Sequence, residues 1–361
     1  MAVVGYSDMG DTGSYWASLR RIHVAWLVTW GVASCRFDLP RLSGDAAGEM
    51  PAVDGPADGP PKPPQFTSCM GLAATCGASA TDNCCRAATV MGGTFRRSYD
   101  GVGYTDMNNP ATISTFVLDK YEVTVGRFRA FVNAGLGTWA LGGAPAAGAG
   151  AHPNLVGSGW DSGWNASLAS ETAALKAAVK CEPSYQTWTD VPGANENKPM
   201  SCVSWYEAMA FCIWDGGYLP TEAEWNYAAS GGSEQRVYPW SNPASSVIID
   251  CANANYNPGT PCTGSISRVG ALPNSDGRDW GQSGHSDLAG NVWEWTLDWY
   301  MDPYPNYQSC NDCANLNTTS TRVIRGGSFV DNALYLHAAL RNSFSPVGRN
   351  ASFGFRCART P

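Results

Sequence analysis

The residues best suited to metal or redox chemistry in this chain are thirteen cysteines and four histidines. A zinc module needs paired Cys-x-x-Cys or Cys/His spacings, and only Cys310 and Cys313 supply half of such a pattern. The histidines are scattered over the chain, at His23, His152, His285 and His337. Disulfides explain the cysteines better than a metal does, and they indicate an exported protein, because cytosolic thiols stay reduced.

The Cys310-Asn311-Asp312-Cys313 segment also has the spacing of a redox motif. Thioredoxin-like motifs lie between a strand and a helix, and the N-terminus of the helix lowers the pKa of the attacking thiol. Neither element is indicated around Cys310, so the sequence favours a structural bridge.

Acidic residues outnumber basic ones, and the formal net charge is −8. Proteins that bind nucleic acid normally carry a basic surplus, so we expect no nucleic-acid partner. Hydrophobic residues make up 44% of the 361 residues and charged residues 15%. This composition allows a sizeable buried core.

Residues 1–35 have the layout of an export signal. Arg20 and Arg21 precede an apolar run, residues 24–32, which is too short to span a bilayer as a helix. The following Val-Ala-Ser-Cys resembles a lipobox, in which Cys35 is lipidated and becomes the new N-terminus. The alternative is a plain secretory signal with an incidental cysteine. Because Arg36 replaces the usual aspartate retention signal, we expect a lipid anchor in the outer membrane or at the cell surface.

The rest of the chain divides by composition into three parts. Residues 36–66 are rich in Pro, Asp and Gly and predict an extended tether. Residues 67–88 carry four cysteines in a segment too short for its own core, so we expect it to be disulfide-stapled and packed on the next domain. Residues 89–361 have the pattern of one domain. The pairing of Cys69, Cys76, Cys84 and Cys85 is left open.

Local signals within residues 89–361 predict an α+β domain with much irregular loop. Ser204 to Glu207 and Thr221 to Glu224 are capping boxes, each of which opens a helix. Thr124 is expected to cap a third helix, after a strand over residues 116–122. The Gly/Ala-rich stretch 134–165 is expected to be an inserted surface loop.

Seven short segments of this domain, in order, closely resemble the formylglycine-generating enzyme or sulfatase-modifying factor family. They are Met91–Phe95, Asp119–Thr124, Val203–Ala208, Leu219–Trp225, Gly290–Trp295, Arg325–Phe329 and Gly354–Cys357. The resemblance covers about residues 89–361. It implies a C-type-lectin-like fold and, for active members, the copper-dependent oxidation of a cysteine in a sulfatase peptide.

The resemblance also places the copper ligands of active members. They are two cysteines, the first three residues after the serine of the Gly-Gly-Ser motif and the second five residues later. Counted from Ser328, these positions hold Asp331 and Leu336. Since soft thiolates select Cu(I), we expect no copper centre here. Ser328, Asp331 and Arg341 are then candidates for a polar cleft that binds a ligand without changing it.

The segment from Asp287 to Glu294 is similar to a calcium loop of the family. The resemblance implies ligands from the Asp287 and Glu294 carboxylates and from the Gly290 and Val292 carbonyls, the oxygen donors that a hard cation needs. A loop held only by hydrogen bonds is the alternative. A second family calcium site, at Asn253, lacks a clear carboxylate partner here.

The resemblance further pairs Cys212 with Cys357. A second family disulfide falls on Ala229 and Ala338, so both of its halves are missing together. Proximity in the sequence adds Cys181 with Cys202, Cys251 with Cys262, and Cys310 with Cys313.

Three function classes remain open from the sequence. The first is a catalytically silent envelope lipoprotein that binds a peptide, glycan or protein partner. The second is an oxidative enzyme, either the copper-dependent oxidase or a relative acting on protein cysteine. The third is a structural component of an envelope assembly. The missing thiolates favour the first.

Overall fold

The computed structural model describes residues 66–361 apart from residues 141, 278–283 and 306–309. The expected signal segment, the Cys35 lipidation site and the tether up to residue 65 lie outside the described residues. Within the described part, no helix is long and apolar enough to cross a membrane.

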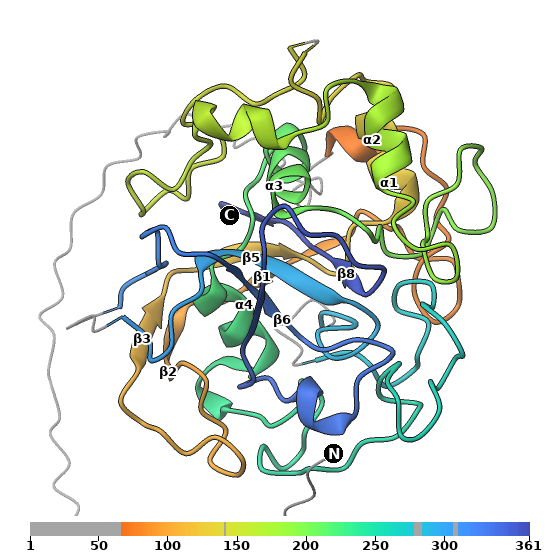
Figure 1. Cartoon of the computed structure of the whole chain (residues 1–361). Coiled ribbons are helices and arrows are strands. Elements are labelled where there is room, and N and C mark those ends of the chain that lie inside the picture. The colour runs from red at the N-terminus through yellow and green to blue at the C-terminus, as the bar shows by residue number, and fades with distance from the viewer. Residues whose placement is uncertain (1–65, 141, 278–283, 306–309) are drawn as a thin grey trace, which may run out of the picture. The chain divides into compact units, whose positions relative to one another are not determined.

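Short strands and short helices alternate with long irregular loops, which confirms the predicted α+β class (Figure 1). The strands are β1 (Ala87–Val90), β2 (Gly93–Arg96), β3 (Pro110–Ile113), β4 (Phe116–Asp119), β5 (Trp293–Trp299), β6 (Arg322–Arg325), β7 (Asn342–Phe344), β8 (Phe353–Gly354) and β9 (Ala358–Arg359). The α-helices are α1 (Val125–Asn133), α2 (Thr172–Ala178), α3 (Trp205–Trp214) and α4 (Glu222–Ala229). Four 3-10 helices are η1 (Thr67–Cys69), η2 (Ser162–Ser167), η3 (Gly232–Glu234) and η4 (Ala333–Leu336).

The described strands form three small sheets. One has the order β1-β4-β9, one is the β2-β3 hairpin, and the largest has the order β7-β6-β5-β8. All pairs are antiparallel except β5 with β8. Helices α1, α2 and α3 lie above β5 and α4 lies below it in Figure 1. Strand β5 is buried along its whole length, as expected for a strand between helices.

Both predicted capping boxes are present. Ser204 accepts from the Glu207 backbone N–H while the Glu207 carboxylate accepts from the Ser204 N–H, and Thr221 and Glu224 repeat this at α4. Thr124 caps α1, as predicted. These helices therefore begin where local chemistry supplies partners for their first N–H groups.

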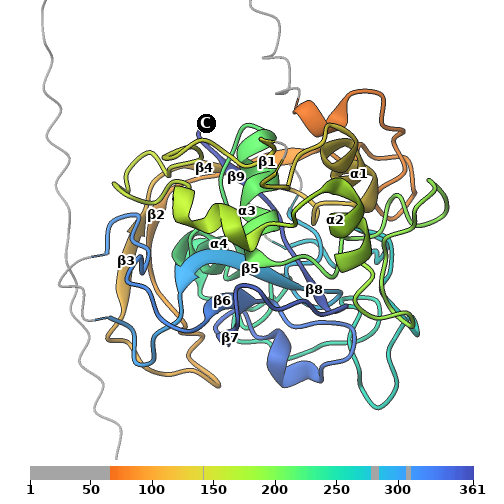
Figure 2. The same cartoon turned by 45° about the horizontal axis from the view of Figure 1, so that its top comes forward.

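The main core packs aromatic side chains from α1, α3 and the C-terminal segment. The ring centroids of Phe128 and Phe211 are 5.8 Å apart, and the ring of Phe355 meets that of Phe211 edge-on at 5.4 Å. Figure 2 shows α1 and α3 on the same side of β5. Edge-on and offset pairs are the favourable aromatic geometries. This core fixes α3 and thereby the start of the terminal Gly-Phe-Arg-Cys segment.

The expectation of a surface loop over residues 134–165 is wrong in part. Trp160 is buried in the main core, and His152 is buried with Nε2 3.2 Å from Glu224 Oε1. Helix α2 follows and buries Leu175. The low local hydrophobicity of the stretch hides these two anchors, which contact residues far along the chain.

Six disulfides join all twelve cysteines that the structure describes. The Cys212–Cys357 bond implied by the family is present, and so are Cys181–Cys202, Cys251–Cys262 and Cys310–Cys313. The pairing that sequence left open is Cys69–Cys85 and Cys76–Cys84. Ala229 and Ala338, at the missing family bridge, are buried in one core cluster.

The Cys-rich segment packs on the domain through a buried network of four charges. Arg127 lies 2.8 Å from Asp119 and 2.7 Å from Asp215, and Arg359 binds both carboxylates. Ser68 joins this network, because its N–H donates to Asp215 and its hydroxyl accepts from Arg127. The first described residues and the last ones therefore meet at one point.

Candidate functional site

A tight turn follows β6 at the Gly-Gly-Ser motif. Gly326 and Gly327 have φ of +97° and +73°, in the region that favours glycine. A Cβ on Gly327 would come within 2.7 Å of Leu336 Cδ1 and 2.9 Å of the Tyr335 carbonyl. The turn therefore requires glycine, and it directs Ser328 towards Asp331.

The family resemblance assigns Asp331 to the position of the first copper thiolate of active members, and in the structure its carboxylate accepts two hydrogen bonds. Its Oδ2 accepts from Ser328 Oγ at 2.5 Å and from Trp293 Nε1 at 2.8 Å. Its carbonyl accepts from the Asn257 N–H at 2.8 Å. Ser328 and Asp331 are thus brought together as predicted, in a fixed arrangement of hydrogen bonds.

The family resemblance assigns Leu336 to the position of the second thiolate, and its side chain is fully buried. It belongs to a core cluster with Val237, Tyr238, Ala254, Tyr256 and Ala289. The Leu336 side chain therefore attaches the end of η4 to this core cluster.

An open groove runs beside Asp331, with a volume of about 620 Å³. One wall is Val330 and η4, and the other is the segment from Tyr256 to Gly259. Val330 and Leu334 are 44% and 68% exposed. Apolar side chains grouped in a hollow of this size mark a contact surface more often than isolated ones do.

The comparisons with known proteins decide the family. A family model described as "Sulfatase-modifying factor enzyme 1-like domain" matches residues 73–361. The formylglycine-generating enzyme of Thermomonospora curvata is 32% identical over 303 residues, covering 75% of this chain and 92% of that protein. The chain belongs to the sulfatase-modifying factor family.

Two further matches describe the breadth of this family. A mouse protein named "Inactive C-alpha-formylglycine-generating enzyme 2" is 28% identical over 292 residues, covering 74% of this chain and 83% of that protein. The solved structure of PvdO from Pseudomonas aeruginosa has a TM-score of 0.52 and 21% identity, and the match covers 76% of this chain and 94% of that one. The structural match shows that the fold is shared.

Arg341 does not join Ser328 and Asp331, so the three-residue cleft expected from the sequence is not formed as such. Its guanidinium binds Glu222 through Nε at 2.5 Å and Nη2 at 2.9 Å, and it donates to the Met301 carbonyl. No sequence signal pointed to Glu222 as a partner, because the two residues are 119 positions apart. In this member of the sulfatase-modifying factor family, Arg341 has a structural role.

The expected calcium loop of the family is tightly turned. Asp287, Gly290 and Asn291 all have positive φ, and Asp287 Oδ2 accepts from the Gly270 N–H at 2.5 Å. Glu294 is held by Arg356 at 2.7 Å from each of its oxygens and by Trp225 Nε1. Within the described residues, no three Asp, Glu, His or Cys side chains converge as metal ligands. Any ion at this loop must therefore rely on carbonyls as well as carboxylates.

Glu122 is a buried acid of this region that the sequence patterns do not reveal. Its Oε2 has no hydrogen-bond partner among the described groups. Burial raises the pKa of Glu122 well above its usual value, and the carboxylate of Asp287 adds to the rise. Burial also raises the pKa of Asp287 to about 6. One Arg356 thus faces three buried carboxyl groups, including Glu294, and a cation bound among them would favour their ionised forms.

We therefore predict that calcium raises the melting temperature of the protein and that a chelator lowers it. A cation that binds only the folded state stabilises by mass action, by about 2.7 kcal/mol at a hundred times its dissociation constant. Scanning calorimetry with calcium and with EGTA measures the difference. Asp287→Asn should abolish the shift, whereas Asp298→Asn, a buried acid elsewhere, should keep it. Equal melting temperatures for the wild type in the two buffers would refute the site.

Proposed function

We propose that this protein is an envelope lipoprotein whose sulfatase-modifying factor domain has no oxidase activity and binds a peptide segment of a partner protein. The observation that carries this proposal is the environment of Asp331 and Leu336, the two residues that the resemblance assigns to the copper thiolates. Asp331 is tied to Ser328 and Trp293, and Leu336 is buried in apolar packing. Neither can supply a sulfur.

Other cysteines are poor substitutes in this proposal. Every cysteine in the described part is in a disulfide, so none of them offers the thiolates that Cu(I) prefers. Asp331 is a hard oxygen ligand, and Leu336 is no ligand. The sulfatase-modifying scaffold supports binding here, without the metal that would activate oxygen.

We predict that the purified protein does not convert cysteine to formylglycine. The assay uses Cu(I), oxygen, a reductant and a sulfatase peptide with the Cys-x-Pro-x-Arg motif, and it detects the aldehyde by mass spectrometry. The wild type should match a no-protein control. Conversion above that control would restore the oxidase as the function.

The groove beside Asp331 is the proposed binding surface. Its position supports a peptide ligand, because active relatives take a cysteine peptide at the neighbouring catalytic site. Its walls carry the exposed apolar side chains of Val330 and Leu334, which suit apolar side chains of a bound peptide. The hydrogen bonds of Asp331 and the apolar packing of Leu336 do not fill this groove.

Peptides selected from a random displayed library test the groove. We expect the enriched peptides to bind the wild type and to lose at least about tenfold affinity with Leu334→Asp, because buried apolar anchors dominate such contacts. Val156→Asp is the matched control, since Val156 is fully exposed and is not a groove residue. Equal binding to wild type and Leu334→Asp would exclude the groove.

The lipid anchor is proposed from the signal sequence alone. We expect a palmitate analogue to label the protein in bacteria through Cys35, and the label to disappear in Cys35→Ser. Labelling that persists in that variant would show attachment elsewhere, and a wild type that takes up no label would favour plain secretion.

A further inference from the structure

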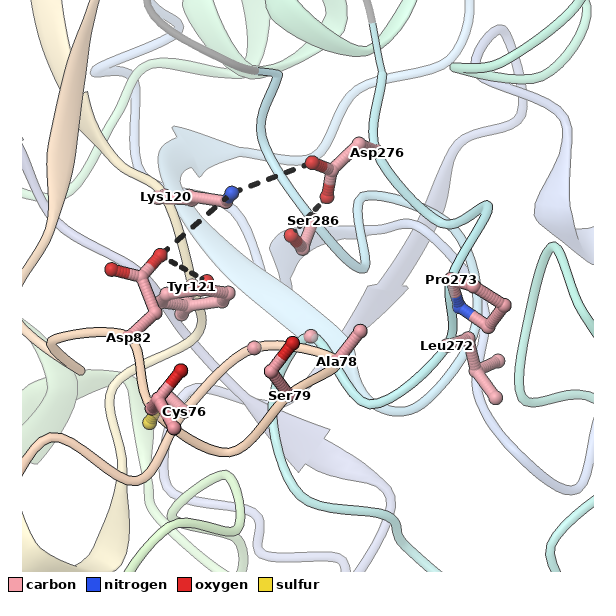
Figure 3. Close-up of a pocket in the computed structure, with 13 residues that line it drawn as sticks. Cys76, Ala78, Ser79, Asp82, Lys120, Tyr121, Leu272, Pro273, Asp276 and Ser286 are labelled. Carbon is pink, nitrogen blue, oxygen red and sulfur yellow. Dashed lines mark hydrogen bonds and ion pairs between the residues drawn. The ribbon is translucent and has the colours of Figure 1, made fainter.

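A second, smaller pocket lies between the Cys-rich segment and the main part of the domain, away from the groove (Figure 3). Its volume is about 210 Å³. Three parts of the chain line it. The first is the loop 76–82, the second is Lys120 with Tyr121, and the third comprises Gly270, Leu272, Pro273, Asp276 and Ser286. Drug-sized ligands need about 300–1,000 Å³, so this pocket suits a single small ring.

The polar groups of this pocket alternate in sign. Lys120 Nζ lies 3.4 Å from Asp276 Oδ2 and 4.0 Å from Asp82 Oδ2, as the dashed lines in Figure 3 show. Asp82 also pairs with Arg86 at 3.2 Å. Lys120 inside the pocket and Arg86 outside its lining thus balance the two carboxylates, and this balance favours a ligand without net charge.

Hydrogen-bonding capacity remains on these groups after their mutual contacts. The Tyr121 hydroxyl donates to Asp82 at 2.8 Å, and Ser286 donates to Asp276. Burial alone would raise the pKa of Asp82, but the hydrogen bonds from Tyr121 and Arg86 lower it, so this acceptor is ionised. A carboxylate has about four acceptor sites and an ammonium three donors. An acceptor and a donor are therefore available side by side at Asp276 and Lys120.

The opposite side of the pocket is apolar and its frame is fixed. Leu272 and Pro273 stand across from Asp82 in Figure 3. The loop 76–82 is closed by the Cys76–Cys84 disulfide, and Arg268 donates to the Ala78 carbonyl at 2.7 Å. A polar wall facing an apolar one in a rigid frame requires little ordering on binding.

We infer that this pocket binds one neutral sugar ring, such as the end of a glycan chain. Of two neighbouring hydroxyls, one donates to the Asp276 carboxylate and the other accepts from the Lys120 ammonium, while a C–H face of the ring packs on Leu272 and Pro273. This site is separate from the peptide groove and does not depend on it.

Saturation-transfer NMR on the purified domain with its disulfides intact tests the inference. The probes are the methyl glycosides of glucose, galactose, mannose and N-acetylglucosamine. At least one should bind, and Asp276→Asn should weaken it at least tenfold. Asp276 is partly exposed, so this change leaves the core untouched. Asp106→Asn is the matched control, because Asp106 is an exposed loop acid outside the pocket.

Two further arms make the outcome decisive. Ser79→Trp, on the exposed rim, should block the sugar by filling the pocket, and Leu334→Asp in the peptide groove should leave it bound. Methylammonium and acetate serve as charged probes. No signal from any glycoside, a response to a charged probe alone, or glycoside binding unchanged in both Asp276→Asn and Ser79→Trp would overturn the inference.

Discussion

Replacing both Cys212 and Cys357 with alanine is expected to lower the free energy of unfolding by about 5 kcal/mol in the chain-entropy model. The bond joins α3 to the C-terminal segment across 145 residues, and closing so long a loop removes much of the freedom of the unfolded chain. Both sulfurs are fully buried, so the loss of packing adds to the effect. Urea unfolding of the two proteins under non-reducing conditions measures it.

The Cys310–Cys313 bond provides the control for this prediction. It spans only 3 residues, and the same model gives about 2 kcal/mol for so short a loop. The double alanine variant at these positions should therefore lose less than half as much. Equal losses would show that local packing, and not chain entropy, sets the value of these bonds.

Glu222→Gln is expected to cost about 3–5 kcal/mol, because it leaves buried guanidinium groups without their counter-charge. Glu222 binds Arg325 at 2.7 Å and Arg341 at 2.5 Å, and all three side chains are at least 90% buried. Gln keeps the size but not the charge. The partly exposed pair of Glu234 with Arg236 gives the control, since Glu234→Gln should change stability by at most about 1 kcal/mol.

The contacts of Glu222 with Arg325 and Arg341 should also make the stability of the protein depend on pH. Burial alone would raise the pKa of Glu222, but Arg341 and Arg325 outweigh burial and lower it to about 2. Because this value lies below that of the unfolded chain, the stabilisation is complete above about pH 4.5 and is lost as the pH falls towards 2. The total is about 3 kcal/mol. Urea midpoints between pH 2 and 6 should fall less steeply in Glu222→Gln, and parallel curves for the two proteins would contradict the assignment.

The parts of the fold that the sequence predicted are those in which cause and effect lie close together. The capping boxes at Ser204 and Thr221 involve residues three positions apart, so their geometry follows from residue type alone. The family disulfide followed from a resemblance spread over the whole domain. The resemblance also placed Ser328 and Asp331 near one position, and the structure joins them by a hydrogen bond.

The parts that were missed depend on contacts between distant segments. Arg341 was expected in the cleft because the resemblance placed it near the catalytic position of active members, but Glu222 binds it from the start of α4. His152 and Trp160 are buried in a stretch whose glycines and alanines predict a surface loop. The unpaired oxygen of Glu122 is visible only once Asp287 and Glu294 are placed around it. Local composition carries no information on such pairs.

The meeting of the first and last described residues at the Arg127 network has a mechanical consequence. A pull on the chain at residue 66 first acts on the bonds of Ser68 to Asp215 and Arg127. If these break, the Cys69–Cys85 bond limits how much chain can be drawn out, because the residues between the two cysteines cannot be extended in line with the force. Tension then passes directly to β1, which pairs with β4 along its full length. If the domain is attached through the residues before 66, its groove and its small pocket lie outside the path of the force.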